Sequence, residues 1–226
     1  MTNNVNKNAG YYGKMEPQEL KPYAKATGLE NNPDIQAIHS YVSKAKKLVE
    51  IGPGYGRVID DILQRTPQTP ILGLESQPSW AAYLQDKYRS ESRVEIRCTE
   101  VGSGLRETLG DLVLAPWSVL MDTTAQGVSA IATDVAHMLA GGGNFLVELP
   151  QATPSGSVGE LTGECITLDT PYGVFEGRMP SLNEFSVDTQ DTNLWLSHKK
   201  TIPYQTGVGL ERRWEVFETP QYNPLK

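Results

Sequence analysis

The chain of 226 residues has few cysteines, fewer basic than acidic residues and no long apolar run. Its two cysteines, Cys98 and Cys165, form no C-x-x-C pair and no metal-ligand spacing, so we expect reduced thiols and no metal site. No apolar stretch approaches the ~20 residues that cross a bilayer, and segment 1–14 lacks the apolar centre of a secretory signal. The expected location is the cytoplasm, without membrane attachment.

Lysine and arginine together number 20 against 27 aspartates and glutamates, which gives a formal net charge of -7. A chain of this charge repels phosphodiester backbones, which disfavours a general nucleic-acid binder. No P-loop and no nucleophile elbow occur, and the three histidines stand in no triad or ligand spacing. The apolar and charged fractions, 38% and 21%, are typical of a soluble globular protein.

Strands alternate with helices between residues 45 and 150. Short apolar strands are expected at 47–51, 71–75, 93–98, from 112, and at 144–149, with helices at 57–65, from 76, and at 125–139. This alternation predicts an α/β fold, with a doubly wound and mostly parallel sheet that has helices on both faces.

The segment before this core, residues 1–44, is expected to be an N-terminal helical cap or lid. Residues 1–10 are predicted to be loosely attached, and a helix interrupted by Pro22 is expected at about 16–27. A second helix should begin with Asn32 as cap and Pro33 at its first position, and should run to about Lys46.

The pattern changes after Pro150, because strand-like runs follow one another without helices. They lie at 164–168, 174–178, 194–202 and 210–218, and turn-forming segments separate them at 170–173, 190–193 and 204–207. Residues 151–226 are therefore expected to form a C-terminal antiparallel β elaboration that completes and roofs the same domain.

A glycine-rich segment, Glu50-Ile51-Gly52-Pro53-Gly54-Tyr55-Gly56, ends the first strand of the core. Open parallel sheets bind ligands at the carboxyl ends of their strands, and alternate glycines let the backbone turn sharply and approach a ligand closely. A dinucleotide motif needs its third glycine one residue later. A carboxylate at Glu50 would also repel a pyrophosphate, whereas it would attract a cofactor that carries an ammonium and a sulfonium.

This segment resembles the first motif of class I S-adenosylmethionine-dependent methyltransferases, acidic-x-G-x-G-x-G, and the likeness continues over residues 45–150. Glu75, at the end of the second strand, matches the carboxylate that binds the cofactor ribose in that family. Glu100 and Val101 match its adenine-binding acidic residue and the next backbone N–H, although Thr99-Glu100 replaces the usual Gly-Asp. Segments 111–117 and 139–145 resemble the fourth-strand motif and the turn before the fifth strand. The resemblance implies a Rossmann-like core that binds S-adenosyl-L-methionine and releases S-adenosyl-L-homocysteine.

The resemblance also implies a set of site residues. In small-molecule members of the family, N-terminal aromatics fold over the cofactor, which adds Tyr12. The expected cofactor contacts are Glu50, Gly52, Pro53, Gly54, Gly56, Glu75, Ser76, Glu100, Val101, Pro116 and Tyr12. No catalytic residue is identified: Trp117 is a candidate for the rim of the active site, and Asp122, His137 and Glu148 are candidates for a general base.

The expected activity is methyl transfer to an amine or hydroxyl of a small molecule or short peptide. The N/D-P-P-Y/F run of the methyltransferases that act on base amino groups is absent, and the long antiparallel segment resembles that of glycine- and aminosugar-type N-methyltransferases. Two alternative functions are a protein or peptide methyltransferase and a non-catalytic cofactor-binding or partner-binding module. A homodimer is also possible. A nicotinamide oxidoreductase is disfavoured by the early third glycine.

Overall fold

The computed structural model describes residues 9–117, 119–140, 142–150, 160–162, 165–185, 187–189 and 194–219. Its largest element is a sheet with the strand order β3-β2-β1-β4-β5-β11-β10-β9. Three predicted segments lie partly or wholly outside the described residues: residues 1–8 of the loose segment predicted at 1–10, Gly141 of the glycine turn and the turn at 190–193. Residues 9 and 10 of the predicted loose segment instead begin a short helix.

The first five strands run parallel to their neighbours. They are β1 (Leu48–Ile51), β2 (Ile71–Glu75), β3 (Val94–Cys98), β4 (Leu112–Ala115) and β5 (Gly143–Pro150). Every residue of β1, β2 and β4 is buried, as expected for strands that are covered on both faces. The parallel core was therefore predicted correctly, with strand ends that differ by only one or two residues.

Antiparallel strands extend the sheet beyond β5. β11 (Glu211–Thr219) pairs with β5, β10 (Leu194–Gln205) pairs with β11, and β9 (Val187–Thr189) pairs with the start of β10. The sheet is therefore mixed: its first five strands are parallel and its last three are antiparallel. Together with the helices it gives the α/β fold that the sequence predicts.

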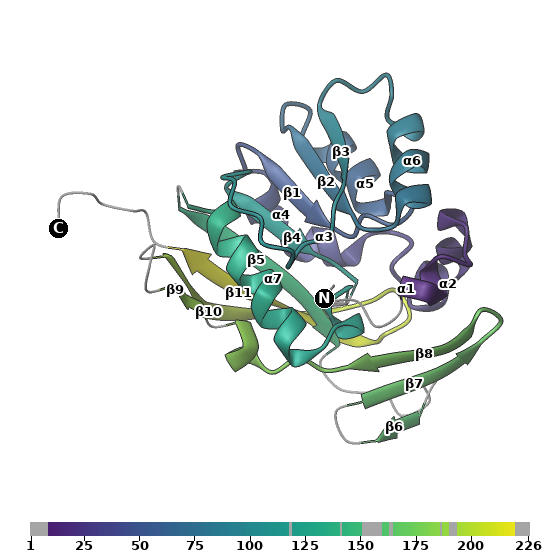
Figure 1. Cartoon of the computed structure of the whole chain (residues 1–226). Helices are drawn as coiled ribbons and strands as arrows, with labels where there is room; N and C mark the ends of the chain where they lie inside the picture. The colour runs from purple at the N-terminus through teal and green to yellow at the C-terminus, as the bar shows by residue number, and fades with distance from the viewer. Residues whose placement is uncertain are drawn as a thin grey trace, which may run out of the picture.

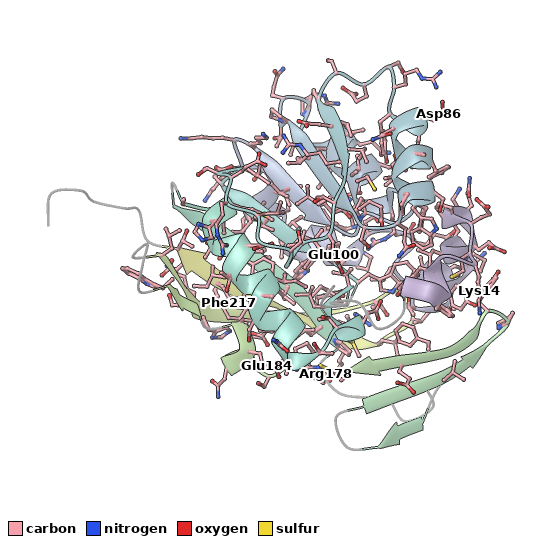
Figure 2. All side chains as sticks on the ribbon, in the orientation of Figure 1. Lys14, Asp86, Glu100, Arg178, Glu184 and Phe217 are labelled. Atoms are coloured by element: carbon pink, nitrogen blue, oxygen red, sulfur yellow. The ribbon has the colours of Figure 1, made fainter. Side chains whose placement is uncertain are left out.

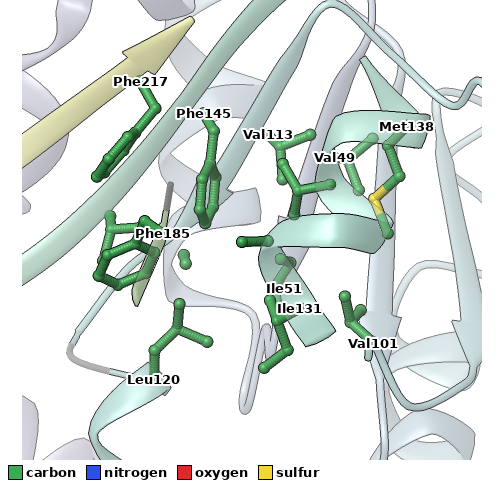
Figure 3. Packing of buried hydrophobic residues seen from close by; sticks show 14 of the residues in the cluster. Val49, Ile51, Val101, Val113, Leu120, Ile131, Met138, Phe145, Phe185 and Phe217 are labelled. Carbon is green, nitrogen blue, oxygen red and sulfur yellow. The ribbon is translucent and has the colours of Figure 1, made fainter. Parts of the chain in front are cut away.

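Helices cover both faces of the sheet (Figure 1). On one face α3 (Pro33–Ala37), α4 (His39–Val42), α5 (Arg57–Arg65) and α6 (Pro78–Lys87) contribute to one apolar cluster. On the other face α7 (Ala125–Met138) and the 3-10 helix η3 (Leu182–Phe185) pack over the sheet. Figure 3 shows this second cluster, in which the rings of Phe145, Phe185 and Phe217 contact one another at tilted angles.

The helix expected from Pro33 to Lys46 is split, so that prediction was wrong in its extent. α3 and α4 meet at Ile38, whose φ of -109° leaves the helical range. Asn32 precedes α3 with a left-handed φ of 51° and makes no side-chain cap. Its side-chain amide nitrogen instead donates to Asp61 at 3.0 Å, and its side-chain oxygen accepts from Arg57 at 2.6 Å. The side chain is thus bonded to charged groups of α5.

The N-terminal segment carries three short helices, α1 (Ala9–Tyr12), the 3-10 helix η1 (Pro17–Leu20) and α2 (Lys21–Ala26). Pro22 stands near the start of α2, so it begins this helix where the sequence predicted an interruption. A separate three-stranded sheet of β6 (Glu160–Thr162), β7 (Cys165–Thr170) and β8 (Gly173–Arg178) lies beside α1 and below the main sheet (Figure 1).

The part of the chain that the structure describes contains no helix long and apolar enough to cross a membrane. Within the same residues, no group of histidine, cysteine, aspartate and glutamate side chains is arranged to hold a metal ion.

Candidate functional site

The strand order reverses between β1 and β4, since the chain passes from β1 outward to β3 and then returns to β4 on the other side of β1. Ligands of open α/β sheets bind at this point, beyond the carboxyl ends of the strands. The segments that follow β1, β2, β3 and β4 therefore form the candidate site, and all of the predicted cofactor contacts except Tyr12 belong to them or to the strand ends before them.

The segment after β1 turns on three glycines with left-handed φ angles, namely 65° at Gly52, 59° at Gly54 and 84° at Gly56. A Cβ atom at Gly52 would lie 2.5 Å from Cγ2 of Val119, and one at Gly56 would lie 2.2 Å from the hydroxyl oxygen of Tyr88. Both positions therefore require glycine for conformation and for space. Pro53 is buried between them.

Glu75 ends β2 next to this glycine loop. Its buried carboxylate accepts the backbone N–H of Gly54 at 3.3 Å and that of Gln77 at 3.0 Å. Burial raises the pKa of Glu75, against the lowering effect of backbone hydrogen bonds from Gln77, Gly54 and Ser76. The carboxylate thus ties the loop after β1 to the loop after β2, with Ser76 half-buried beside it.

Glu50 is the most unusual group of the site. Its side chain is 1% exposed, and its Oε2 atom finds no hydrogen-bond partner among the described residues. Burial raises the pKa of the Glu50 carboxyl to about 8, although the positive charge of Arg57 lowers it. Arg57 is itself held by Asp34, with nitrogen–oxygen distances of 2.9 and 2.6 Å. An unpaired buried carboxylate is costly, so a cationic ligand group would be stabilised here.

The loop after β3 carries Glu100 and Val101. Val101 is buried in the apolar cluster under α7, while Glu100 is half-buried and lies near the centre of the molecule in Figure 2. The loop is fixed by Asp134 of α7, whose carboxylate accepts the N–H groups of Gly102 at 2.7 Å and Gly104 at 3.1 Å. Sequence analysis missed Asp134. The available signal was an acidic residue among the buried positions of an apolar helix.

The segment after β4 contains Pro116, Trp117 and the 3-10 helix η2 (Val119–Asp122). Pro116 is buried and accepts the N–H of Val119 at 3.2 Å. Trp117 has a left-handed φ of 51°, which is rare for a bulky residue and concentrates at functional sites. Its side chain is half-buried and packs with Tyr55 against the N-terminal segment.

Tyr12 reaches this edge from α1. Its hydroxyl donates a hydrogen bond to the buried carboxylate of Asp122, and its ring meets the edge of Trp80 with 5.4 Å between ring centroids. Burial, followed by the charge of Asp122, raises the pKa of Tyr12 well above its usual value, so the hydroxyl remains a donor. The indole N–H of Trp80 donates to the carbonyl of Met15 at 2.9 Å, which anchors the same segment.

The structure corrects two of the base candidates. His137 lies near the end of α7, where the carbonyl of Met138 accepts the N–H of Leu109 just before β4 begins. That is the amino edge of the sheet, opposite the candidate site. Glu148 is buried in an ion pair with Arg212 and accepts the hydroxyl of Tyr204 at 2.6 Å, so its oxygens are committed to structural bonds.

No family model and no curated protein matches this sequence. Solved structures match it in fold. The N-methyltransferase NodS from Bradyrhizobium japonicum WM9, in complex with S-adenosyl-L-homocysteine, is 13% identical with a TM-score of 0.64, over 94% of this chain and 99% of that one. The glycopeptide N-methyltransferase MtfA, also complexed with S-adenosyl-L-homocysteine, is 11% identical with a TM-score of 0.64, over 91% and 99%.

A third similar structure is the 1,6-didemethyltoxoflavin-N1-methyltransferase of Burkholderia thailandensis, with bound 1,6-didemethyltoxoflavin and S-adenosylhomocysteine. It is 12% identical with a TM-score of 0.61, over 93% of this chain and 87% of that one. At these identities the likeness shows the fold. The chain has the class I methyltransferase fold that the glycine loop led us to expect.

Proposed function

We propose that this protein is an S-adenosyl-L-methionine-dependent methyltransferase that transfers a methyl group to an amine or hydroxyl of a small molecule or short peptide. The observation that carries the proposal is the glycine loop at the switch point, with its three left-handed glycines bounded by the buried carboxylates of Glu50 and Glu75. That edge offers close backbone approach together with carboxyl groups whose charged forms a cationic ligand would stabilise.

The residues present fit this cofactor. Glu75 would accept the two ribose hydroxyls, since one carboxylate has acceptor sites for both in addition to its backbone bonds. The unpartnered oxygen of Glu50 would stabilise the cofactor ammonium, and the backbone of Gly52 and Gly54 would lie against the ligand. Glu100 and Val101, in the loop that Asp134 holds, would contact the adenine.

When bound, the cofactor supplies a methyl group that is already activated on a sulfonium sulfur. The chain itself then has to hold the acceptor in line with that methyl, and positioning of this kind contributes about 7–11 kcal/mol to a reaction. The fixed elements at the site suit such a task, because Val119 of η2 packs against Gly52 while Tyr12 binds Asp122 at the end of η2.

The small-molecule acceptor is supported by the similar structures, in which one protein is described as a glycopeptide N-methyltransferase and another contains bound 1,6-didemethyltoxoflavin. It is also supported by the chain's net charge of -7, which disfavours nucleic-acid acceptors.

The test is a methyl-transfer assay with labelled cofactor and a panel of amine and hydroxyl metabolites and short peptides. We expect production of S-adenosyl-L-homocysteine that depends on the acceptor, and a loss of at least tenfold in cofactor affinity in Glu75→Ala. A folded protein that binds the cofactor without turning over any acceptor would indicate a non-catalytic module instead. Equal affinity in Glu75→Ala would refute the site.

A further inference from the structure

Asp122 stands where the glycine loop meets the three-stranded sheet. It ends η2, whose first residue, Val119, packs directly against Gly52. On its other side, Nε of Arg178 in β8 donates to the carbonyl of Thr123 at 3.0 Å. The carboxylate, 4% exposed, therefore lies between the glycine loop and the three-stranded sheet.

Aromatic rings surround the same place. The ring of Tyr12, whose hydroxyl binds Asp122, contacts Trp80 on one side and Tyr11 on the other, with centroid distances of 5.4 and 5.2 Å. Tyr11 continues the row to Phe175 of β8 at 5.8 Å. Aromatic faces attract cations, with a contribution of about 0.5–2 kcal/mol for each favourable contact.

Carboxyl groups gather at this edge, and a bound cation would favour their ionised forms. Glu50 and Glu75 are buried beside the glycine loop, and no basic side chain of the described residues forms an ion pair with either of them. Arg57, the nearest buried cation, is committed to Asp34. A negatively charged acceptor would be repelled here, and a cationic one would be attracted.

We propose that the methyl acceptor is an amine that arrives as an ammonium ion, and that the Asp122 carboxylate binds this ammonium and takes its proton, with Tyr12 as the positioning residue. This inference rests on the proposed methyltransferase function and deepens it. It selects the amine because an ammonium brings a full positive charge to the carboxylate and gains Coulombic attraction, whereas the hydroxyl of an alcohol is neutral.

The ammonium passes one proton to Asp122, which becomes a neutral carboxylic acid, and the amine nitrogen regains its lone pair. The nitrogen then forms a bond to the methyl carbon while the carbon–sulfur bond breaks and its electron pair stays on sulfur. The product leaves as an N-methylammonium ion with S-adenosyl-L-homocysteine, and Asp122 releases its proton to water.

The hydroxyl of Tyr12 directs the carboxylate and stabilises its charged form. Tyr12→Phe keeps the ring and removes this one hydrogen bond, so the carboxylate should hold its proton more tightly. Tyr172→Phe is the matched control, because it removes a different hydroxyl on the same side of the molecule, the one that donates to Glu19.

The experiment measures methyl transfer to matched primary amines and alcohols on benzyl, phenethyl and cyclohexyl skeletons, with binding of S-adenosyl-L-homocysteine measured in parallel. We expect turnover of amines and at least a hundredfold lower kcat/KM for the corresponding alcohols. Asp122→Asn should lower kcat/KM for the amine on the order of 10²-fold or more, the range of general-base contributions, while product affinity changes less than threefold.

The pH profile separates a positioning role from a structural one. In Tyr12→Phe the acid limb of kcat/KM should move to higher pH, and in Tyr172→Phe it should stay in place. Three results would each overturn the inference. They are methylation of alcohols as efficiently as amines, no turnover of any amine, and an acid limb of kcat/KM that stays in place in Tyr12→Phe. If the wild-type protein does not bind S-adenosyl-L-homocysteine, it is the proposed function that fails.

Discussion

Replacing Glu50 by glutamine should stabilise the protein at neutral pH while weakening its cofactor binding. Burial raises the pKa of the Glu50 carboxyl from 4.5 to about 8. Below pH 4.5 this group is protonated in both the folded and the unfolded chain, so it costs nothing. As the pH rises, the unfolded chain ionises first, and the free energy of unfolding falls until the folded group ionises near pH 8.

The size of this loss in the free energy of unfolding follows from the interval between the two pKa values of Glu50. Each pH unit between the two pKa values lowers the free energy of unfolding by about 1.4 kcal/mol, so the wild-type chain should lose roughly 2–3 kcal/mol between pH 5 and pH 7 through Glu50 alone. Glu50→Gln lacks this loss. For a chain of this size, the melting temperature of Glu50→Gln minus that of wild type should be roughly 5–11 °C larger at pH 7 than at pH 5.

The assay is urea unfolding of both proteins at pH 5 and pH 7. At each pH the free energy of unfolding of wild type is subtracted from that of Glu50→Gln, and the two results are compared. This comparison removes the pH-independent effect of the amide and the titration of all other groups. Glu107→Gln, which makes the same substitution at an exposed position, is the control. A stability difference between Glu50→Gln and wild type that is the same at both pH values would refute the reasoning.

Further predictions concern the loops and the ion pair that shape the site. Gly54→Ala should lower affinity for S-adenosyl-L-homocysteine at least tenfold, whereas Gly209→Ala, at a similar left-handed φ of 81° with open space around it, should leave calorimetric affinity unchanged. Arg57→Met should lower the free energy of unfolding by about 3–5 kcal/mol in urea titrations, because it leaves its buried aspartate partner unpaired. Asp134→Ala should reduce hydrogen-exchange protection in the loop after β3 and weaken binding of adenosine-containing ligands. Calorimetry at pH 7 in buffers of different ionisation enthalpy should detect release of up to one proton on cofactor binding, which Glu50→Gln should abolish.

The parallel core could be predicted from sequence because its signals are local. A strand buried on both faces is an apolar run such as Leu48–Ile51, and a glycine loop after it needs left-handed φ angles that only certain residues adopt. The two candidate carboxylates could be located from sequence for the same reason, since Glu50 and Glu75 stand at fixed places relative to their strands.

The rest depends on contacts between residues far apart in the chain. The bond from Tyr12 to Asp122 spans 110 positions, and no local pattern shows which aromatic residue covers which strand end. The break at Ile38 has no signal in the propensities of residues 33–46, and the same segment is tied to α5 by the buried ion pair of Asp34 with Arg57. Glu148 was only a candidate base in the sequence, because its partner Arg212 stands 64 positions later and no local pattern joins the two.

Calorimetric titration with S-adenosyl-L-methionine and S-adenosyl-L-homocysteine, with NAD as the control ligand, tests the central claim most directly. We predict micromolar binding of both sulfur ligands and no binding of NAD, because the buried carboxyl groups at the glycine loop favour a cation and disfavour a pyrophosphate. A folded protein that binds neither sulfur ligand, or that prefers NAD, would contradict it.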